Sequence, residues 1–399
     1  MIKSNNQPGY ILVFSLMFIA LLVMLAIRIS DRGRVHVSYV KTMIDRERAK
    51  MLAFSGLQIA MTQLAIKEES KKQDQPDSKE GEKKDQKGTQ SKGVGKLWTE
   101  KESKEFIKQV WPYLHRWQEF ELTRGTYGTD GVIRICIGCE EGKIDINQTF
   151  DFNDDPKKRK FIGQSKTAST PDKSKADKNN FKKVFEEIFK KITKFIKGEE
   201  RFKAFENYLV KKKQFEKIYK NRQNKLYDTT EFLRLKGFEG FADKVFYTPY
   251  LEKGRKIREK PTVYWTDIFT IFSGSKQISS WFISPSIKRL LGFKEKEGMK
   301  IADKIKKAEN ISKNFKATLK FPEDWNNFFA PIYGMKYENL PKWFTPLLNT
   351  KFEPKTFSVL SYGEVNKVSC KIFAIIERKK IRKGKKTVVE FDIKKFYCV

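Results

Sequence analysis

The chain opens with a run of uncharged, mostly apolar residues at 10–27, which follows a short polar leader ending in Pro8-Gly9. At helical rise this run is roughly 27 Å long, about the thickness of a hydrocarbon core. Beyond it, apolar residues recur at every third, fourth or seventh position as far as Leu64, which is the period of one helix face. The pattern predicts one long helix over residues 10–66, half transmembrane span and half amphipathic rod.

Small residues lie along one side of the second half of this helix, at Ala49, Ala53, Gly56 and Ala60. Small side chains let a second backbone come close. Two interpretations are open: a membrane anchor with a helical stalk, or a helix that packs among similar helices in a filament. We favour the filament and expect the small residues to face those neighbouring helices.

Composition divides the chain after the rod into further parts. Residues 67–97 are almost wholly charged, small or amide residues, which cannot bury a core and predict a disordered charged linker. Residues 98–150 combine helical and strand-like patterns, residues 151–300 carry aromatic stripes at helical spacing with a flexible stretch at 156–180, and residues 301–399 end in strands. We therefore predict an α+β fold with an antiparallel sheet and an inserted, mostly α-helical domain.

Alternating apolar and polar residues predict the strands. Before the insertion these are 120–123, 132–139 and 143–147, the last two joined into a hairpin by a turn at 140–142; a further strand is expected at 267–273; near the end they are 357–362, 368–377 and 387–396, with a basic turn at 378–386. Helical stripes are predicted at 181–197 and 201–222, and shorter helices at 230–235, at 287–291 after a Ser284-Pro285 cap, and at 302–307.

The chain is strongly basic, with 82 Lys and Arg against 49 Asp and Glu and a formal net charge of +33. Such a charge raises the hypothesis of a membrane-tethered polyanion-binding protein. Lysine is spread over nearly the whole chain rather than gathered in one stripe, so we expect no specific nucleic acid as a partner. Neither histidine, His36 or His115, lies near a nucleophile motif, and we predict that the protein is not an enzyme.

The four cysteines leave several interpretations open. Cys136 and Cys139 form a C-x-x-C pair on a predicted strand, where residues three apart point to opposite faces, so a local disulfide would need a bulge. Packed thiols, a structural disulfide, and metal or redox chemistry are the alternatives, in that order of preference. Cys370 and Cys398 lie near opposite ends of the last predicted hairpin, and a register that sets them side by side would allow a disulfide there.

A short acidic run, Asp151, Asn153, Asp154 and Asp155, offers oxygen atoms of the kind that bind calcium. It lacks the glycine and the distant glutamate of an EF-hand loop, so a solvated loop is the favoured interpretation. These residues are weak calcium candidates; no other metal ligand is assigned, and we expect no required cofactor.

Several segments together resemble the K-type minor pseudopilins of the type II (general) secretion pathway and their type IV pilin relatives. In residues 45–64 the family pattern A-x-x-G-x-x-x-A-x-x-x-L is met by Ala53, Gly56, Ala60 and Leu64. The segment GKIDIN at 142–147 resembles the strand that precedes the family's helical insertion, with Asp145 in place of an Asn. Residues 269–292 resemble a second recurring element, and FSVLSYG at 357–363 follows the closing pattern F-x-V-x-S-x-G.

The resemblance implies how the amino terminus is processed. Residues 1–9 resemble a prepilin leader, which prepilin peptidase would cut between Gly9 and Tyr10. Most pilin-like proteins then carry Glu as the fifth mature residue, where this chain has Phe14. The K-type subunits lack that Glu, which suits a subunit at the very tip of a filament, with no neighbour above it.

The function implied is that of a non-enzymatic tip subunit that initiates pseudopilus assembly for protein secretion; the alternative within the superfamily is a minor pilin of a type IV pilus. Implied partners are other minor pseudopilins in a tip complex, the inner membrane, prepilin peptidase and secreted cargo. Family members bind calcium in the helical insertion, so the resemblance also implies calcium as a possible ligand. The implied location is single-pass in the inner membrane, amino terminus cytoplasmic and head periplasmic. The charges flanking the span, with Arg28, Arg32 and Arg34 after it, favour the opposite orientation.

Leader cleavage can be tested directly by mass spectrometry of the amino terminus of the protein isolated from its native membranes. We expect a mature chain that begins at Tyr10, with or without N-methylation. An intact Met1 in membranes that contain active prepilin peptidase would contradict the assignment.

Overall fold

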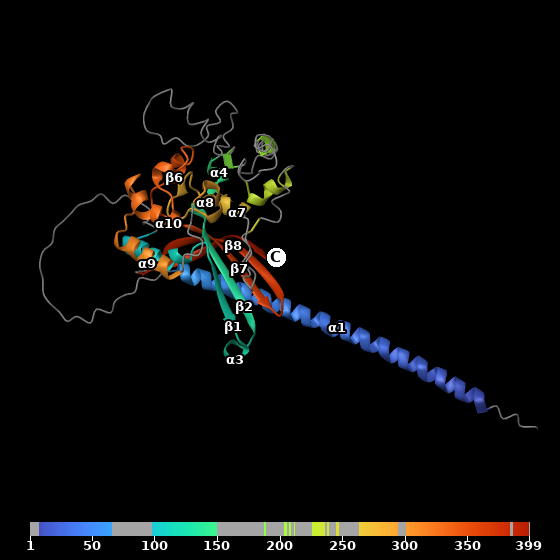
Figure 1. Ribbon diagram of the computed structural model, residues 1–399. Helices are drawn as coiled ribbons and strands as arrows, with labels where there is room; N and C mark the ends of the chain where they lie inside the picture. Colours follow the sequence, from blue (N-terminus) through green and yellow to red (C-terminus); the bar gives the residue numbers. More distant parts are fainter. Residues whose placement is uncertain are drawn as a thin grey trace, which may run out of the picture.

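A computed structural model describes residues 8–65, 98–149, 226–235, 263–293, 301–383 and 386–398, with short pieces at 187–188, 203–205, 207–208, 211, 238 and 245–246. The fold is α+β, as predicted: a long apolar helix at the amino terminus, an antiparallel sheet and further helices. Helix α1 (Pro8–Leu64) is continuous, and its blue first half extends from the body as a single rod (Figure 1). The predicted linkers at 67–97 and 156–180 and most of the stripes at 181–222 lie outside the described residues.

The main sheet has the order β1-β2-β7-β8-β9, and each neighbouring pair is antiparallel. Its strands are β1 (Trp117–Leu122), β2 (Gly131–Cys139), β7 (Thr356–Val365), β8 (Val368–Lys383) and β9 (Lys386–Cys398). The sheet therefore joins a hairpin from before the insertion to the three closing strands. This pairing across the sequence confirms the predicted closing strands and the strand at 132–139.

The predicted basic turn at 378–386 was wrong in extent. Strand β8 continues through it, and pairing reaches Lys383 opposite Lys386. Acidic and aromatic partners allow these basic residues to stay in a strand: the Arg378 guanidinium lies 3.8 Å from the Trp98 ring centre, and Lys379 Nζ lies 2.8 Å from an Asp392 carboxylate oxygen. Pattern alone did not reveal those partners.

The predicted hairpin of 132–139 with 143–147 was also wrong. Strand β2 pairs with β1 and β7, and after the 3-10 turn η2 (Glu140–Gly142) the chain forms only the short strand β3 (Ile144–Asp145), then helix α4 (Ile146–Thr149). Strand β3 pairs in parallel with β4 (Phe269–Thr270). The turn packs against a distant segment instead: the Gly142 carbonyl accepts a 3.1 Å hydrogen bond from the Ser284 N–H, and a Cβ on Gly142 would lie 1.7 Å from the Phe282 carbonyl oxygen.

The predicted strand at 267–273 is reduced to β4, because helix α7 (Trp265–Ile268) occupies its start. Helix α8 (Pro285–Leu291) begins as predicted, with the Ser284 hydroxyl accepting from the Ile287 N–H and proline as the first helical residue. The 3-10 helix η4 (Thr229–Arg234) is capped by Asp228. Helix α9 (Ile301–Lys313) includes the predicted 302–307.

The remaining described elements are α2 (Glu100–Gln109), η1 (Trp111–Tyr113), α3 (Arg124–Tyr127), β5 (Ile278–Ser279), the π-helix η6 (Trp325–Phe329), α10 (Ala330–Tyr333), η7 (Tyr337–Asn339), η8 (Thr345–Leu347) and β6 (Leu348–Asn349). Most of them contribute to an aromatic core beside the sheet, whereas α3 has no buried residue. Trp265, Trp281 and Trp325 are among the largest fully buried side chains. Helices α8, α9 and α10 gather at the end of the sheet away from the projecting half of α1 (Figure 1).

Candidate functional site

Helix α1 has two halves with opposite environments. From Leu12 to Ile44 its residues are exposed, and they include large apolar side chains such as Phe14, which is 62% exposed. The described residues contain one helix that is long and apolar enough to cross a membrane, and that helix is α1. Water does not tolerate so large an apolar surface on one rod, so this half needs an apolar environment outside the chain.

The second half of α1 lies on the sheet. Ala49, Ala53, Ala60 and Leu64 are fully buried, and the helix contacts β7, β8 and β2. The expectation that the small residues face helices of other subunits was therefore wrong. They face the chain's own sheet, because a flat strand surface, like a neighbouring helix, permits close approach only where side chains are short.

Two glycines set the distance between helix and sheet. A Cβ on Gly363 of β7 would lie 2.0 Å from the Ala49 carbonyl oxygen and 2.6 Å from the Ala53 nitrogen. A Cβ on Gly56 of α1 would lie 2.2 Å from the Ser361 hydroxyl. The Ser361 hydroxyl in turn donates a 2.8 Å hydrogen bond to the Ala53 carbonyl. The closing pattern F-x-V-x-S-x-G thus supplies the Ser and the Gly that this contact requires.

Polar and aromatic contacts hold the helix at both ends of this seat, which we define as residues 45–64 of α1 and the strand face beneath them. At the start, Asn366 Nδ2 donates to both carboxylate oxygens of Asp45 at 3.2 Å. Near the end, the side-chain amides of Gln63 and Gln118 exchange hydrogen bonds of 2.9 and 3.1 Å. On one flank the Phe54 ring stacks on the Phe396 ring of β9, with 5.5 Å between centres.

A groove lies where the exposed half of α1 meets the head. Its volume is about 490 Å³, and its lining includes Val37, Val40 and Ile44 of the helix with Arg124 and Asn366 of the head. The other lining residues are polar: His36, Lys41, Asp45 and Arg48. The apolar stripe of the helix therefore continues outside the expected span, into a surface that the head only partly covers.

At the root of the insertion, two side chains of the GKIDIN segment bind backbone. Buried Asp145 accepts hydrogen bonds from the Gly274 N–H at 2.9 Å and the Ser273 hydroxyl at 3.0 Å, and burial raises its pKa to about 6. Asn147 exchanges hydrogen bonds of 3.0 and 2.8 Å with the Leu226 backbone. The chain thus leaves and returns at one clamp, as expected for an Asp or Asn at a strand end.

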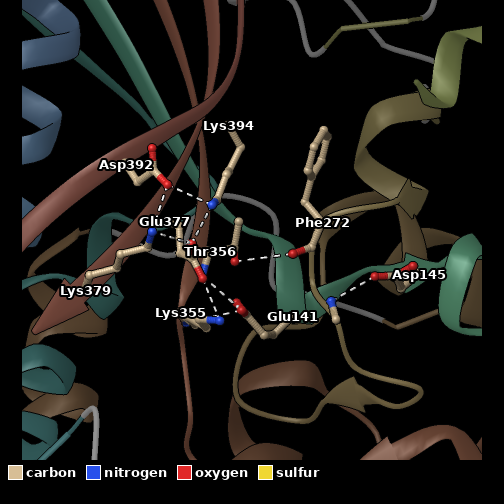
Figure 2. Close-up of polar contacts among 10 residues, drawn as sticks. Glu141, Asp145, Phe272, Lys355, Thr356, Glu377, Lys379, Asp392 and Lys394 are labelled. Carbon is tan, nitrogen blue, oxygen red and sulfur yellow. Dashed lines mark hydrogen bonds and ion pairs between the residues drawn. The ribbon is translucent and has the colours of Figure 1, made fainter. Parts of the chain in front are cut away.

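A second buried carboxylate, Glu141, ties η2 to the start of β7. It accepts from the N–H groups of Lys355 and Thr356, at 3.2 and 2.9 Å (Figure 2). It also accepts from the Cys139 thiol at 3.0 Å. Burial raises its pKa to about 7. Nearby, burial acts to raise the pKa of Glu377, but hydrogen bonds from Lys355 and Lys394 outweigh it and lower the pKa to about 2. Sequence reasoning missed both carboxylates, because their partners are distant in the chain.

The cysteines divide into two pairs. Cys136 and Cys139 are buried free thiols in different apolar clusters, in line with the expectation that they point to opposite faces of the strand. Burial raises the pKa of each well above its usual range. Cys370 Sγ and Cys398 Sγ lie 3.7 Å apart. Among the described residues there is no group of three or more His, Cys, Asp or Glu placed to hold a metal ion.

Other predicted site residues have definite positions or fall outside the described part. Gly9 and Tyr10 lie in the first turns of α1, before its exposed apolar half. His115 is partly buried, with Nδ1 3.9 Å from an Asp267 carboxylate oxygen, beside a cavity of about 40 Å³. The weak calcium candidates Asp151, Asn153, Asp154 and Asp155 lie outside the described residues, so calcium binding stays a prediction.

Comparison with known proteins gave one solved structure. No known protein family and no curated protein matches the sequence. The chain is similar to a chain in the crystal structure of the GspK-GspI-GspJ complex from the enterotoxigenic Escherichia coli type 2 secretion system, with 12% identity and a TM-score of 0.34. The match covers 92% of this chain and 99% of that one. So low a TM-score carries no functional conclusion.

The seat predicts a specific sensitivity at Gly363. In Gly363→Ala the new methyl group meets the backbone of α1, so the helix must move off the sheet, at a cost of about 1–3 kcal/mol in the free energy of unfolding. Urea denaturation of the full chain in detergent measures the loss, and hydrogen exchange should rise within residues 45–64. The matched control is Gly33→Ala, where the structure has nothing within 4 Å and alanine favours the helix. Equal stability of the two variants would contradict the seat.

The buried Glu141 predicts a pH dependence. The pKa of Glu141 is about 7 in the folded chain, compared with an ordinary value of 4.5. Its contribution to the free energy of unfolding is therefore complete below pH 4.5, where the carboxyl is protonated in both states, and is lost as the pH rises to 7. Relative to Glu141→Gln, the free energy of unfolding of the wild type should fall by about 3 kcal/mol over that interval. Urea denaturation across the pH range measures this, with Glu121→Gln on the surface as the control. Parallel curves for wild type and Glu141→Gln would refute it.

Proposed function

We propose that the protein is a non-enzymatic K-type minor pseudopilin that sits at the tip of a type II secretion pseudopilus and initiates its assembly. One observation carries the proposal: a single helix whose apolar half is exposed over its described length while its other half packs one face on its own head. Such a helix anchors the chain and offers a surface to neighbours at the same time. In this role the head contributes contacts rather than reactions.

The extent of the apolar surface supports an assembly role over a simple anchor. Lipid accounts for a span of about 20 residues. Beyond it, Val35, Val37 and Tyr39 are 70%, 67% and 62% exposed, and Val40 and Ile44 add to them at helical spacing. Polar stalks need no such residues, whereas helices of neighbouring subunits would bury them.

Two features support a place at the tip. A Glu inside the membrane costs about 2.5–3.5 kcal/mol unless a partner pairs with it, and in ordinary pilins that partner is implied to be the terminal amine of a neighbour. This chain has Phe14 at the corresponding position, so it needs no neighbouring amine as a partner there. The insertion predicted at 151–300 would add bulk to the head, which would hinder stacking inside a filament and would be tolerated at its end.

The same proposal covers processing and location. Prepilin peptidase would remove residues 1–9, the apolar half of the mature helix would wait in the inner membrane, and the head would lie on the periplasmic side with other minor pseudopilins as its partners. Secreted cargo would be a further partner. Any calcium would bind outside the described residues. The minor pilin of a type IV pilus is the nearest alternative and shares the same helix chemistry.

Site-specific photo-crosslinking tests the assembly surface. A photoreactive residue is placed at Val37 in the full chain, in its native cells, with Glu309 on the exposed side of α9 as the control position. We expect Val37 to capture another subunit with an oily amino-terminal helix and Glu309 to capture none. Loss of the gene should abolish secretion into the medium, whereas loss of pili alone would favour the pilus alternative.

Two outcomes would overturn the proposal. The first is capture only of lipid at Val37, since a plain anchor would then explain the helix. The second is labelling of the head along the whole filament in immunogold micrographs, since a tip subunit labels one end. Retention of the full chain on DNA with steep salt dependence would instead support the polyanion-binding hypothesis.

A further inference from the structure

Two thiols from the consecutive strands β8 and β9 meet on the helix-facing side of the sheet. Cys398 of β9 lies opposite Ile372 of β8, so Cys370 is its diagonal neighbour across the strand pair. The two sulfur atoms are 3.7 Å apart, with Cys370 buried and Cys398 exposed. Cys370 lies opposite Gly363, the residue whose backbone touches α1. The thiol pair therefore borders the seat of the helix.

We propose that Cys370 and Cys398 form an intramolecular disulfide that fastens the outer strand β9 to β8 and so secures the seat of α1. Bond formation requires the sulfur atoms to close from 3.7 Å to about 2.05 Å, a shift that side-chain rotation and a small movement of an outer strand can supply. Cys398 is exposed to an oxidant, whereas Cys136 and Cys139 are buried in two different clusters.

The oxidation balances with any disulfide-bearing oxidant, such as oxidised glutathione. The Cys398 thiolate attacks one sulfur of the oxidant, forms a mixed disulfide and releases the first thiol. Cys370 then attacks Cys398 Sγ, which forms the Cys370–Cys398 bond and releases the second thiol. Two electrons and the two cysteine protons pass to the oxidant, which leaves as two thiols.

The surroundings set the order of these steps. Burial, and then the neighbouring Cys398, raise the pKa of the Cys370 thiol to about 11, so Cys370 is the poorer first nucleophile. Arg46 and Lys50 of α1 act in the other direction and favour its thiolate. The exposed Cys398 therefore reacts first and Cys370 resolves the mixed disulfide.

The link would act on the helix through β9. Phe396, which stacks on Phe54 of α1, lies two positions before Cys398 on the same strand face. An outer strand opens more readily than a central one, and among the described strands β9 pairs with β8 alone. Joining Cys398 to β8 therefore keeps the Phe396 ring against the helix. The pairing chemistry is independent of the proposed function; its oxidation in the cell rests on a periplasmic head.

The test uses the full chain in detergent, equilibrated with mixtures of reduced and oxidised glutathione, alkylated and digested. Peptide mass spectrometry should find a Cys370–Cys398 link, with Cys136 and Cys139 alkylated only after unfolding. Oxidation should raise the melting temperature by about 5 °C and slow hydrogen exchange at residues 45–64. Cys136→Ser is the matched control and should keep the link and the shift, and Cys398→Ser should lose both.

A link from Cys370 or Cys398 to any other cysteine, or dimers joined through Cys398, would overturn the inference. So would a glutathione adduct that persists on Cys398 while Cys370 stays reduced. A link that forms without change in the melting temperature or in exchange at 45–64 would refute its role in holding the helix. None of these results depends on the crosslinks at Val37, so the two proposals can fail separately.

Discussion

The structure depends on how closely two backbones approach. The Ala49 carbonyl and the Ala53 nitrogen of α1 lie against Gly363 of β7, where no side chain beyond hydrogen would fit. Ser361 uses the same proximity to reach the Ala53 carbonyl. This contact fixes which residues of the helix are buried. From Leu12 to Ile44 the helix is exposed and the head covers its last turns only in part, so the need for an external partner follows from that division.

Local pattern was enough to predict the long helix, strand β2 and most of the closing strands. The period of apolar residues in α1, the alternation in β2 and the closing strands, and the Ser284 cap are all properties of neighbouring residues. Pattern failed where a partner from elsewhere decides the outcome. The basic run after Glu377 has the pattern of a turn, but Trp98 and Asp392 contact its side chains in the folded chain and the run forms a strand. The small residues of α1 are equally suited to a sheet and to another helix.

The polar clamps show the same limit. Asp145 bonds Gly274 and Glu141 bonds Thr356, over separations of 129 and 215 residues. Resemblance drew attention to Asp145 and Asn147 because they stand in a recurring segment. Nothing in the sequence marked Glu141, since a buried carboxylate is recognised only by the N–H groups around it. Together these three side chains hold the segment that follows β2 against residues far along the chain.

The continuity of α1 has a mechanical consequence. The helix has 57 residues, about 86 Å at helical rise, and its one proline stands at its first residue. With no hinge of that kind between its free end and its buried end, a thrust applied at the free end would travel along the axis into β7 and its neighbours. Strain would then fall on the interlocked glycines rather than on a flexible neck. A continuous helix of this kind would therefore transmit a displacement of its free end directly to the sheet.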